Sequence, residues 1–245
     1  MGKSQERREP ALAWEALWQR ARTDILLPAE SGDFDAFLFE HVTRVAYAAR
    51  RIMTLDEVGQ AQPDEAVVLA AALYHDAGWA VRVREGDVGR EEVLVRPPGP
   101  LHFEQGAMML EKSLAKLLPN NVLRRAAEAV LAIPDRQTPI IEAQIVSDAN
   151  NLDEFGMLTL WPTVRRGTLD GKGVQAVLET WRRRQEYRFW EARLADSFRF
   201  EAVRAVAERR LAVFEQFMTV LDAESTGADI HFPGQVLASG DLPGA

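Results

Sequence analysis

The sequence predicts an all-α protein: a helical bundle with additional helices at its C-terminal end. Two observations support this prediction. Apolar residues recur every three or four positions in several separate segments, including a nearly all-apolar one that follows Pro63 and Asp64. Residues 174–223 again show helical period, with many Arg, Glu and aromatic residues. Such spacing places apolar side chains on one face of a helix, where they can form a shared core.

The length of 245 residues is enough for one sizeable core. We therefore expect a main helical domain over residues 1–165, including an N-terminal helix. Residues 166–224 are expected to form a helical extension packed on the same core. Residues 225–245, which contain several Gly, Pro and Asp, are predicted to be a flexible tail.

The first half of the main domain contains three predicted helices. The first runs from Pro10 to about Leu27 and ends before Pro28. The second begins near Asp33 or Asp35, continues to about residue 53, and carries His41 beside its apolar stripe. The third begins after Pro63 and Asp64 and ends at Gly78. Because nearly all of its residues are apolar, it should be the buried central helix.

The second half is predicted to begin with a long functional loop or lid over residues 80–101, which lack a sustained period. Helices are expected at residues 101–118, at 122–133, and through the stretch IIEAQIVSDANNLDEFG, which Gly156 caps. Residues 174–223 should form two long helices. Their aromatic residues are interpreted as helix-packing core or a homodimer surface, not as a base-stacking platform.

The composition excludes several classes of function. The sequence contains no cysteine, so disulfides, thiolate catalysis and iron–sulfur clusters are excluded, and any metal must be bound by His, Asp or Glu. The net charge of −8 argues against a nucleic-acid partner. The charged N-terminus and the lack of a long apolar run predict a cytoplasmic protein without a membrane partner.

Two carboxylates are predicted to be buried. Asp76 follows His75 at the end of the most apolar helix, with no Lys or Arg within one turn. Asp148 lies in the middle of an apolar stripe, which is formed by Ile141, Ile145, Leu152 and Phe155. Burying an ionised carboxylate is costly unless it is paired or bound to a cation.

A shared metal ion would satisfy these carboxylates together with two histidines. His41, His75, Asp76 and Asp148 are therefore predicted to bind one divalent ion, such as Mn, Fe, Co, Ni, Zn or Mg. Four protein ligands would leave two octahedral positions for water or substrate oxygens, an arrangement suited to hydrolysis.

The order of these residues resembles the HD-domain superfamily of metal-dependent phosphohydrolases. His41, the His75-Asp76 pair in AALYHDAGW and Asp148 in IVSDANNLDEFG carry the resemblance, over about residues 35–160. It implies an HD-type helical bundle and the same four metal ligands. His102 resembles an additional ligand of two-metal members, but Asp135 and Arg136 stand where a further His is expected, so one metal is predicted.

The positions of several residues suggest roles in catalysis, and the resemblance implies a class of substrate. Asp76 or Asp148 would orient a metal-activated water, and His102 would donate a proton or merely cap its helix. Arg44, three positions after His41, would bind a phosphate, or form a salt bridge with Glu40 or Asp35. The expected substrate is a small phosphorylated metabolite or nucleotide.

Two other functions remain open. Many relatives have Asp and Arg where this chain has Asn150 and Asn151, which is compatible with a non-catalytic metal- or ligand-binding module. An oxygen-using di-iron protein of the same superfamily would need more ligands than the sequence offers. His231, in the predicted tail, is not expected to take part.

Overall fold

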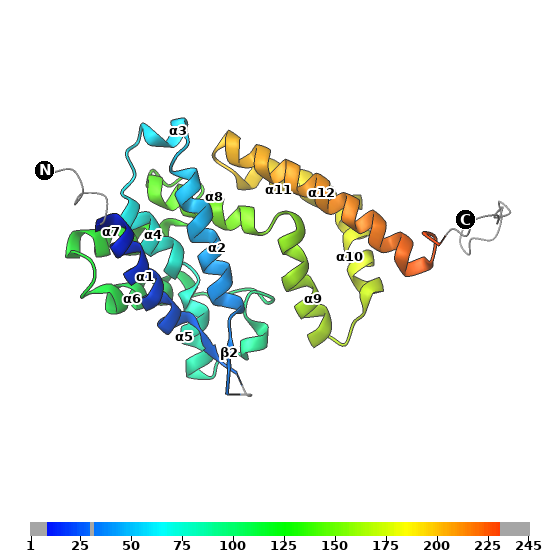
Figure 1. The fold of residues 1–245 in the computed structure, drawn as a ribbon, viewed down its shortest axis with the longest axis horizontal. Helices are drawn as coiled ribbons and strands as arrows, with labels where there is room; N and C mark the ends of the chain where they lie inside the picture. The colour runs from blue at the N-terminus through cyan, green and yellow to red at the C-terminus, as the bar shows by residue number, and fades with distance from the viewer. Residues whose placement is uncertain (1–8, 30–31, 231–245) are drawn as a thin grey trace, which may run out of the picture.

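The computed structural model describes residues 9–29 and 32–230, and almost all of them lie in helices or short connections (Figure 1). The all-α prediction is confirmed. Two short strands, β1 (Leu27–Pro28) and β2 (Phe34–Asp35), form one antiparallel pair in which Leu27 lies opposite Asp35. Within the described part of the chain, no helix combines the length and the hydropathy needed to cross a bilayer.

The first group of helices forms the left-hand part of Figure 1. In chain order these elements are α1 (Glu9–Ile25), α2 (Phe37–Ile52), α3 (Asp56–Gly59), α4 (Glu65–Tyr74), α5 (Ala77–Glu85), the short 3-10 helix η1 (Arg90–Glu92), α6 (His102–Leu114), α7 (Asn120–Ala132) and α8 (Ile141–Asp153).

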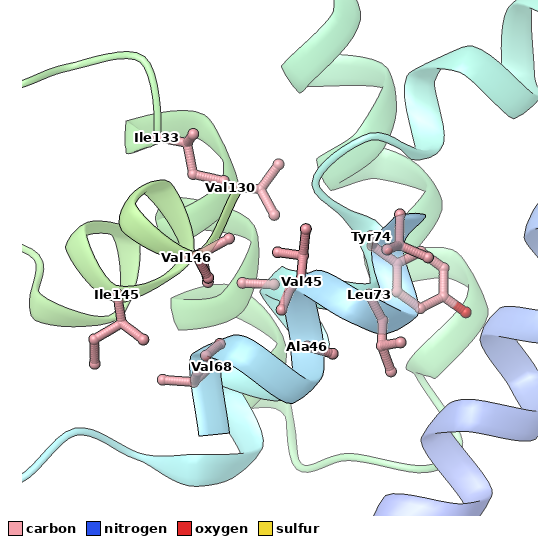
Figure 2. Close-up of a cluster of buried hydrophobic side chains, with 14 of the residues drawn as sticks. Val45, Ala46, Val68, Leu73, Tyr74, Val130, Ile133, Ile145 and Val146 are labelled. Atoms are coloured by element: carbon pink, nitrogen blue, oxygen red, sulfur yellow. The ribbon is translucent and has the colours of Figure 1, made fainter. Parts of the chain in front are cut away.

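The central helix of this group is α4, and its start agrees with the sequence. The Asp64 side chain accepts hydrogen bonds from the backbone N–H groups of Ala66 and Val67, which satisfies two donors at the start of the helix. All residues from Val67 to Tyr74 are buried. α4 packs against α2, α7 and α8, and Figure 2 shows the interface, with Val45, Ala46, Val68, Leu73, Val130, Ile145 and Val146 among its side chains.

The predicted loop over residues 80–101 is partly wrong, because α5 continues to Glu85. Gly78 does not end a helix. It lies inside α5, where a Cβ atom would come within 2.3 Å of the His102 carbonyl oxygen, so glycine is needed for α6 to approach. The residue after α5, Gly86, adopts the left-handed conformation with φ 78° and ends that helix.

The second group of helices follows α8, at the right and top of Figure 1. It contains the 3-10 helix η2 (Gly156–Thr159), α9 (Leu160–Leu169), α10 (Val174–Glu186), α11 (Phe189–Ser197) and α12 (Glu201–Thr226). The prediction of two long helices over residues 174–223 is wrong. The helical conformation is interrupted at Arg188, which has φ 52°, and again in the extended stretch between α11 and α12.

Aromatic residues hold this second group together, which confirms the packing interpretation for several of them. The ring of Trp190, on α11, lies 5.5 Å from that of Phe155, 6.1 Å from that of Trp181 and 6.2 Å from that of Phe214 (centroid distances). α12 continues to Thr226, beyond the expected end of the extension. Residues 231–245 of the predicted tail, including His231, lie outside the described residues.

Candidate metal centre

The predicted ligands His41, His75 and Asp76 meet where three buried helices come together. His41 lies on the buried face of α2. His75 and Asp76 form the turn between α4 and α5, His75 as the C-cap of α4 and Asp76 as the N-cap of α5. Because α4 is buried along most of its length, the turn at its end is buried as well: His75 is 0% and Asp76 9% exposed.

The three side chains present one possible ligand atom each, and these atoms lie within 4.8 Å of one another. Asp76 Oδ2 lies 3.3 Å from His41 Nε2 and 3.7 Å from His75 Nε2. Neither Nε2 atom has a hydrogen-bond partner among the described residues, although both are buried. Two imidazole nitrogens and a carboxylate oxygen therefore face one another without a shared proton donor, as in a site for a divalent cation.

In both histidines a hydrogen bond from Nδ1 fixes the orientation of the ring, so that Nε2 faces Asp76. His75 Nδ1 lies 2.8 Å from the carbonyl oxygen of Ala72, and an oxygen acceptor requires Nδ1 to donate. His41 Nδ1 likewise donates to Asp153 Oδ2 at 2.8 Å. When each ring is neutral, as it must be to bind a metal, its lone pair is then on Nε2, the arrangement that orients metal-binding histidines.

The charges around these groups favour a cation. Burial is the largest influence on His41 and lowers its pKa, but the carboxylates of Asp153 and Asp76 outweigh burial and raise that pKa to about 9. Burial lowers the pKa of His75. For Asp76, burial acts to raise the pKa, but His75, His102 and His41 together hold it well below its usual range. The centre thus contains one neutral imidazole, that of His75. The carboxylates of Asp76 and Asp153 create a negative potential at His41, which favours a positive charge there.

His102 contacts Asp76 from the other side. It is the first residue of α6, and its Nε2 lies 2.9 Å from Asp76 Oδ1. This contact fixes the orientation of the carboxylate and leaves Oδ2 facing His41 and His75. The close approach of α6 depends on Gly78 and on Gly106, where a Cβ atom would lie 2.9 Å from the carbonyl oxygen of Tyr74.

The structure gives Asp148 a different place from the one expected of a fourth ligand. It is completely buried, but its carboxylate accepts hydrogen bonds from the backbone N–H groups of Arg199, at 2.9 Å, and Phe200, at 3.0 Å. Burial outweighs these bonds and raises the pKa of Asp148. Its partners are thus the backbone donors just before α12 and the guanidinium of Arg199, whose Nη1 lies 3.5 Å from Asp148 Oδ1. It is not in the group formed by His41, His75 and Asp76.

The residue of α8 that reaches the centre is Asp153, which the sequence analysis did not single out. It binds His41, and it accepts two hydrogen bonds from Arg44, at 2.8 and 2.9 Å. Burial acts to raise the pKa of Asp153, but these bonds lower it to about 2. Asn150 and Asp153, three positions apart, both line the same cavity. This spacing places Asn150 and Asp153 on one face of α8, and it is the sequence signal that could have identified Asp153.

Arg44 does not pair with Glu40 or Asp35, the salt-bridge partners suggested from the sequence. Arg44 pairs with Asp153. Asp35 is bound by Arg165 at 2.6 Å, and no ion pair joins Arg44 to Glu40 among the described residues. The Arg44 side chain is still 31% exposed and lines the cavity, so it remains placed to contact a bound anion.

A cavity of about 430 Å³ opens onto the centre, a volume typical of small-molecule sites. His41, Asp76, His102 and Asp153 line one part of it. The second group of helices closes the other part, through side chains of α9, α10 and α11. Five arginines line the cavity: Arg44, Arg96, Arg166, Arg184 and Arg193. The overall charge of the chain is negative, but this cavity combines a cation site with cationic side chains.

The donor set fits a divalent metal. Three nitrogen and oxygen donors converge, two of them otherwise unpartnered, and hydrogen bonds to Asp153, Ala72 and His102 hold all three side chains in position. Among the described residues this is the one group of three or more His, Asp or Glu side chains close enough to share an ion. The geometry is therefore consistent with a single metal site.

Comparison with known proteins shows similarity to the HD domain and to several solved structures. The model of the HD domain matches residues 38–154. Similar solved structures include a predicted HD superfamily hydrolase from an uncultured Thermotogales bacterium, at 17% identity and a TM-score of 0.52, covering 86% of this chain and 92% of that one. YpgQ of Bacillus subtilis in complex with ADP has 18% identity and a TM-score of 0.56, covering 88% and 100%.

The Lin1889 protein of Listeria innocua has 15% identity and a TM-score of 0.55, covering 90% of this chain and 98% of that one. No curated protein matches the chain by sequence. At these identities the solved structures show a shared fold, which extends beyond the matched segment into the C-terminal helices. The chain thus contains an HD domain at residues 38–154.

Proposed function

We propose that this protein is a metal-dependent hydrolase of phosphate esters that acts on a small phosphorylated metabolite or nucleotide. The main support is the pair of unpartnered Nε2 atoms of His41 and His75 beside Asp76, at the wall of an arginine-lined cavity. When bound there, a divalent ion would supply Lewis acidity and a water that ionises near neutral pH. Mn, Fe, Co, Ni, Zn and Mg are all candidates.

The residues of the chain have distinct tasks in this proposal. His41, His75 and Asp76 hold the ion. Asp153 and His102 position His41 and Asp76, respectively. Arg44 binds an oxygen of the phosphoryl group, because its guanidinium lines the cavity and Asp153 fixes its position.

A nucleotide is the first substrate class to test. YpgQ, which shares this fold, is described in complex with ADP. The volume of the cavity and its five arginines suit a phosphorylated small molecule.

The test is a hydrolysis assay on the purified full-length chain. Elemental analysis first gives the bound metal and its stoichiometry. Nucleoside mono-, di- and triphosphates and p-nitrophenyl phosphate are then incubated with Mn, Co, Ni or Mg. We expect turnover that Asp76→Ala abolishes and that Asp56→Ala, an exposed carboxylate in α3, leaves unchanged. No turnover above Asp76→Ala with any substrate and metal would contradict the proposal.

One observation favours a second function, a non-catalytic metal- or ligand-binding module. The carboxylates that line the cavity are Asp76, Asp153 and Glu154, and each is already engaged. Asp76 contacts His102, Asp153 contacts His41 and Arg44, and Glu154 contacts Arg193 at 2.5 Å. The cavity therefore offers no free carboxylate as a general base. Stabilisation by metal without any turnover would support this alternative.

A further inference from the structure

Arg184, on α10, lies on the wall of the metal-centre cavity. Its guanidinium makes no hydrogen bond or ion pair with any residue that the structure describes. Instead, its Cζ lies 5.1 Å from the ring centroid of Phe189 and 5.5 Å from that of Trp190. The two rings hold the side chain in place but leave its donors free.

The surroundings of Arg184 are unfavourable for a cation. Burial lowers the pKa of Arg184, and Arg183, Arg166 and Arg193 lower it further, while Glu154 acts in the opposite direction. Glu154 is itself paired with Arg193. A positive potential therefore remains in this part of the cavity, and a bound anion would relieve it.

A second donor without a partner belongs to another residue of this wall. Trp190 is 3% exposed, and its indole Nε1 is buried without a hydrogen-bond partner among the described residues. Trp190 lines the cavity together with Arg184. An indole N–H can only donate, so both groups on this wall require an acceptor.

We propose that Arg184 and the indole N–H of Trp190 form an anion subsite for a phosphoryl group other than the one at the metal centre. The substrate would then belong to the compounds with two or more linked phosphates. The two sites are separate parts of one cavity, because the metal ligands come from α2 and the α4–α5 turn and the subsite from α10 and α11. This inference rests on the proposed function.

Calorimetric titration of the metal-loaded full-length protein with inorganic pyrophosphate and with orthophosphate tests the subsite directly. Arg184→Gln is compared with Arg182→Gln, the same change at an exposed residue of α10 that pairs with Asp222 and does not line the cavity. We expect Arg184→Gln to weaken pyrophosphate binding about tenfold or more, the usual effect of a lost charge-assisted hydrogen bond. Orthophosphate binding should be preserved, and Arg182→Gln should have no effect on either ligand.

Two further variants separate binding from folding. Trp190→Phe removes the N–H but keeps an aromatic ring, and should weaken pyrophosphate binding in the same direction. Arg184→Lys keeps the charge and should retain part of the affinity that Arg184→Gln loses. Circular dichroism melting identifies any variant that is unfolded. Unchanged pyrophosphate affinity in Arg184→Gln, or an equal loss for both ligands, would overturn the subsite.

The same variants distinguish failure of the subsite from failure of the proposed function. If no substrate is turned over but Arg184→Gln still loses pyrophosphate selectively, the hydrolase proposal fails and the subsite stands. If substrates are turned over, Arg184→Gln should raise KM for nucleoside diphosphates and leave KM for p-nitrophenyl phosphate unchanged. If substrates are turned over but Arg184→Gln changes neither the KM of either substrate nor the affinity for pyrophosphate, the hydrolase proposal stands and the subsite is refuted.

Discussion

His41 donates a hydrogen bond from Nδ1 to Asp153 Oδ2 across 2.8 Å, which links the middle of α2 to the last residue of α8. The bond determines that Nε2 of His41 faces Asp76. Asp153 also binds Arg44, so one carboxylate positions both a metal ligand and a cationic side chain of the cavity.

We therefore expect Asp153→Asn to weaken metal binding without removing a ligand. Loss of such an outer carboxylate typically lowers metal affinity about 10–100-fold, because the histidine is less well oriented and less basic. Calorimetric titration with Mn²⁺ measures the change. Asp56→Asn, the same substitution at an exposed position in α3, is the control and should bind as the unmodified protein does. Equal affinities of the two variants would show that Asp153 does not support the metal site.

Asp148→Asn should reduce stability and leave metal binding intact. The carboxylate accepts the backbone N–H groups of Arg199 and Phe200 in the buried interior, and an amide would turn a donor toward one of them. Each buried donor left without a partner costs about 1–3 kcal/mol. Urea unfolding of the metal-free protein measures the loss, and elemental analysis measures the metal content. Loss of metal with unchanged stability would instead restore Asp148 to the ligand role expected from the sequence.

Binding of a divalent ion should raise the melting temperature of the protein. Stabilisation by a ligand at 100 times its dissociation constant amounts to about 2.7 kcal/mol, provided that it binds only the folded state. Differential scanning fluorimetry with added Mn²⁺, and then with a chelator, should show a shift that reverses. In Asp76→Asn, which lacks the charged ligand between His41 and His75, the shift should disappear. A shift of the same size in this variant would place the ion elsewhere.

These experiments bear on what the sequence could and could not predict. Local patterns identified the start of α4 at Asp64, and the burial of His41, His75 and Asp76, because the apolar residues that surround them are neighbours in the chain or one turn away. The hydrogen-bond partners of Asp148 could not be predicted in this way. Its burial was predicted correctly, but its partners, Arg199 and Phe200, are distant in sequence, and a buried carboxylate can be satisfied by backbone donors as well as by a cation.

The same limit explains the errors in the helices. Most of α5 was predicted as a loop because residues 80–101 lack a sustained period, and Gly78 was predicted to end the preceding helix. That glycine is required by contact with His102, a tertiary feature absent from the local pattern. The place of Arg184 in the cavity is likewise absent from the local pattern, because it depends on how α10 packs against the first group of helices.

Gly78→Ala tests the contact between α5 and α6. A Cβ atom at Gly78 would lie 2.3 Å from the carbonyl oxygen of His102 and 2.8 Å from its Nδ1, so α6 must move away. We expect a loss of about 1–3 kcal/mol in the free energy of unfolding, as for other overpacked sites. Because His102 would no longer reach Asp76, the affinity for Mn²⁺ should fall as well.

Gly59→Ala is the matched control for this prediction. Gly59 ends α3, and a Cβ atom there would meet nothing within 4 Å. Alanine should therefore be neutral or stabilise the protein by up to about 1 kcal/mol, through the lower entropy of the unfolded chain. Urea unfolding of both variants, with metal titration of each, separates the two effects. If Gly78→Ala behaves like Gly59→Ala in both measurements, close packing of α6 against α5 is not what positions His102.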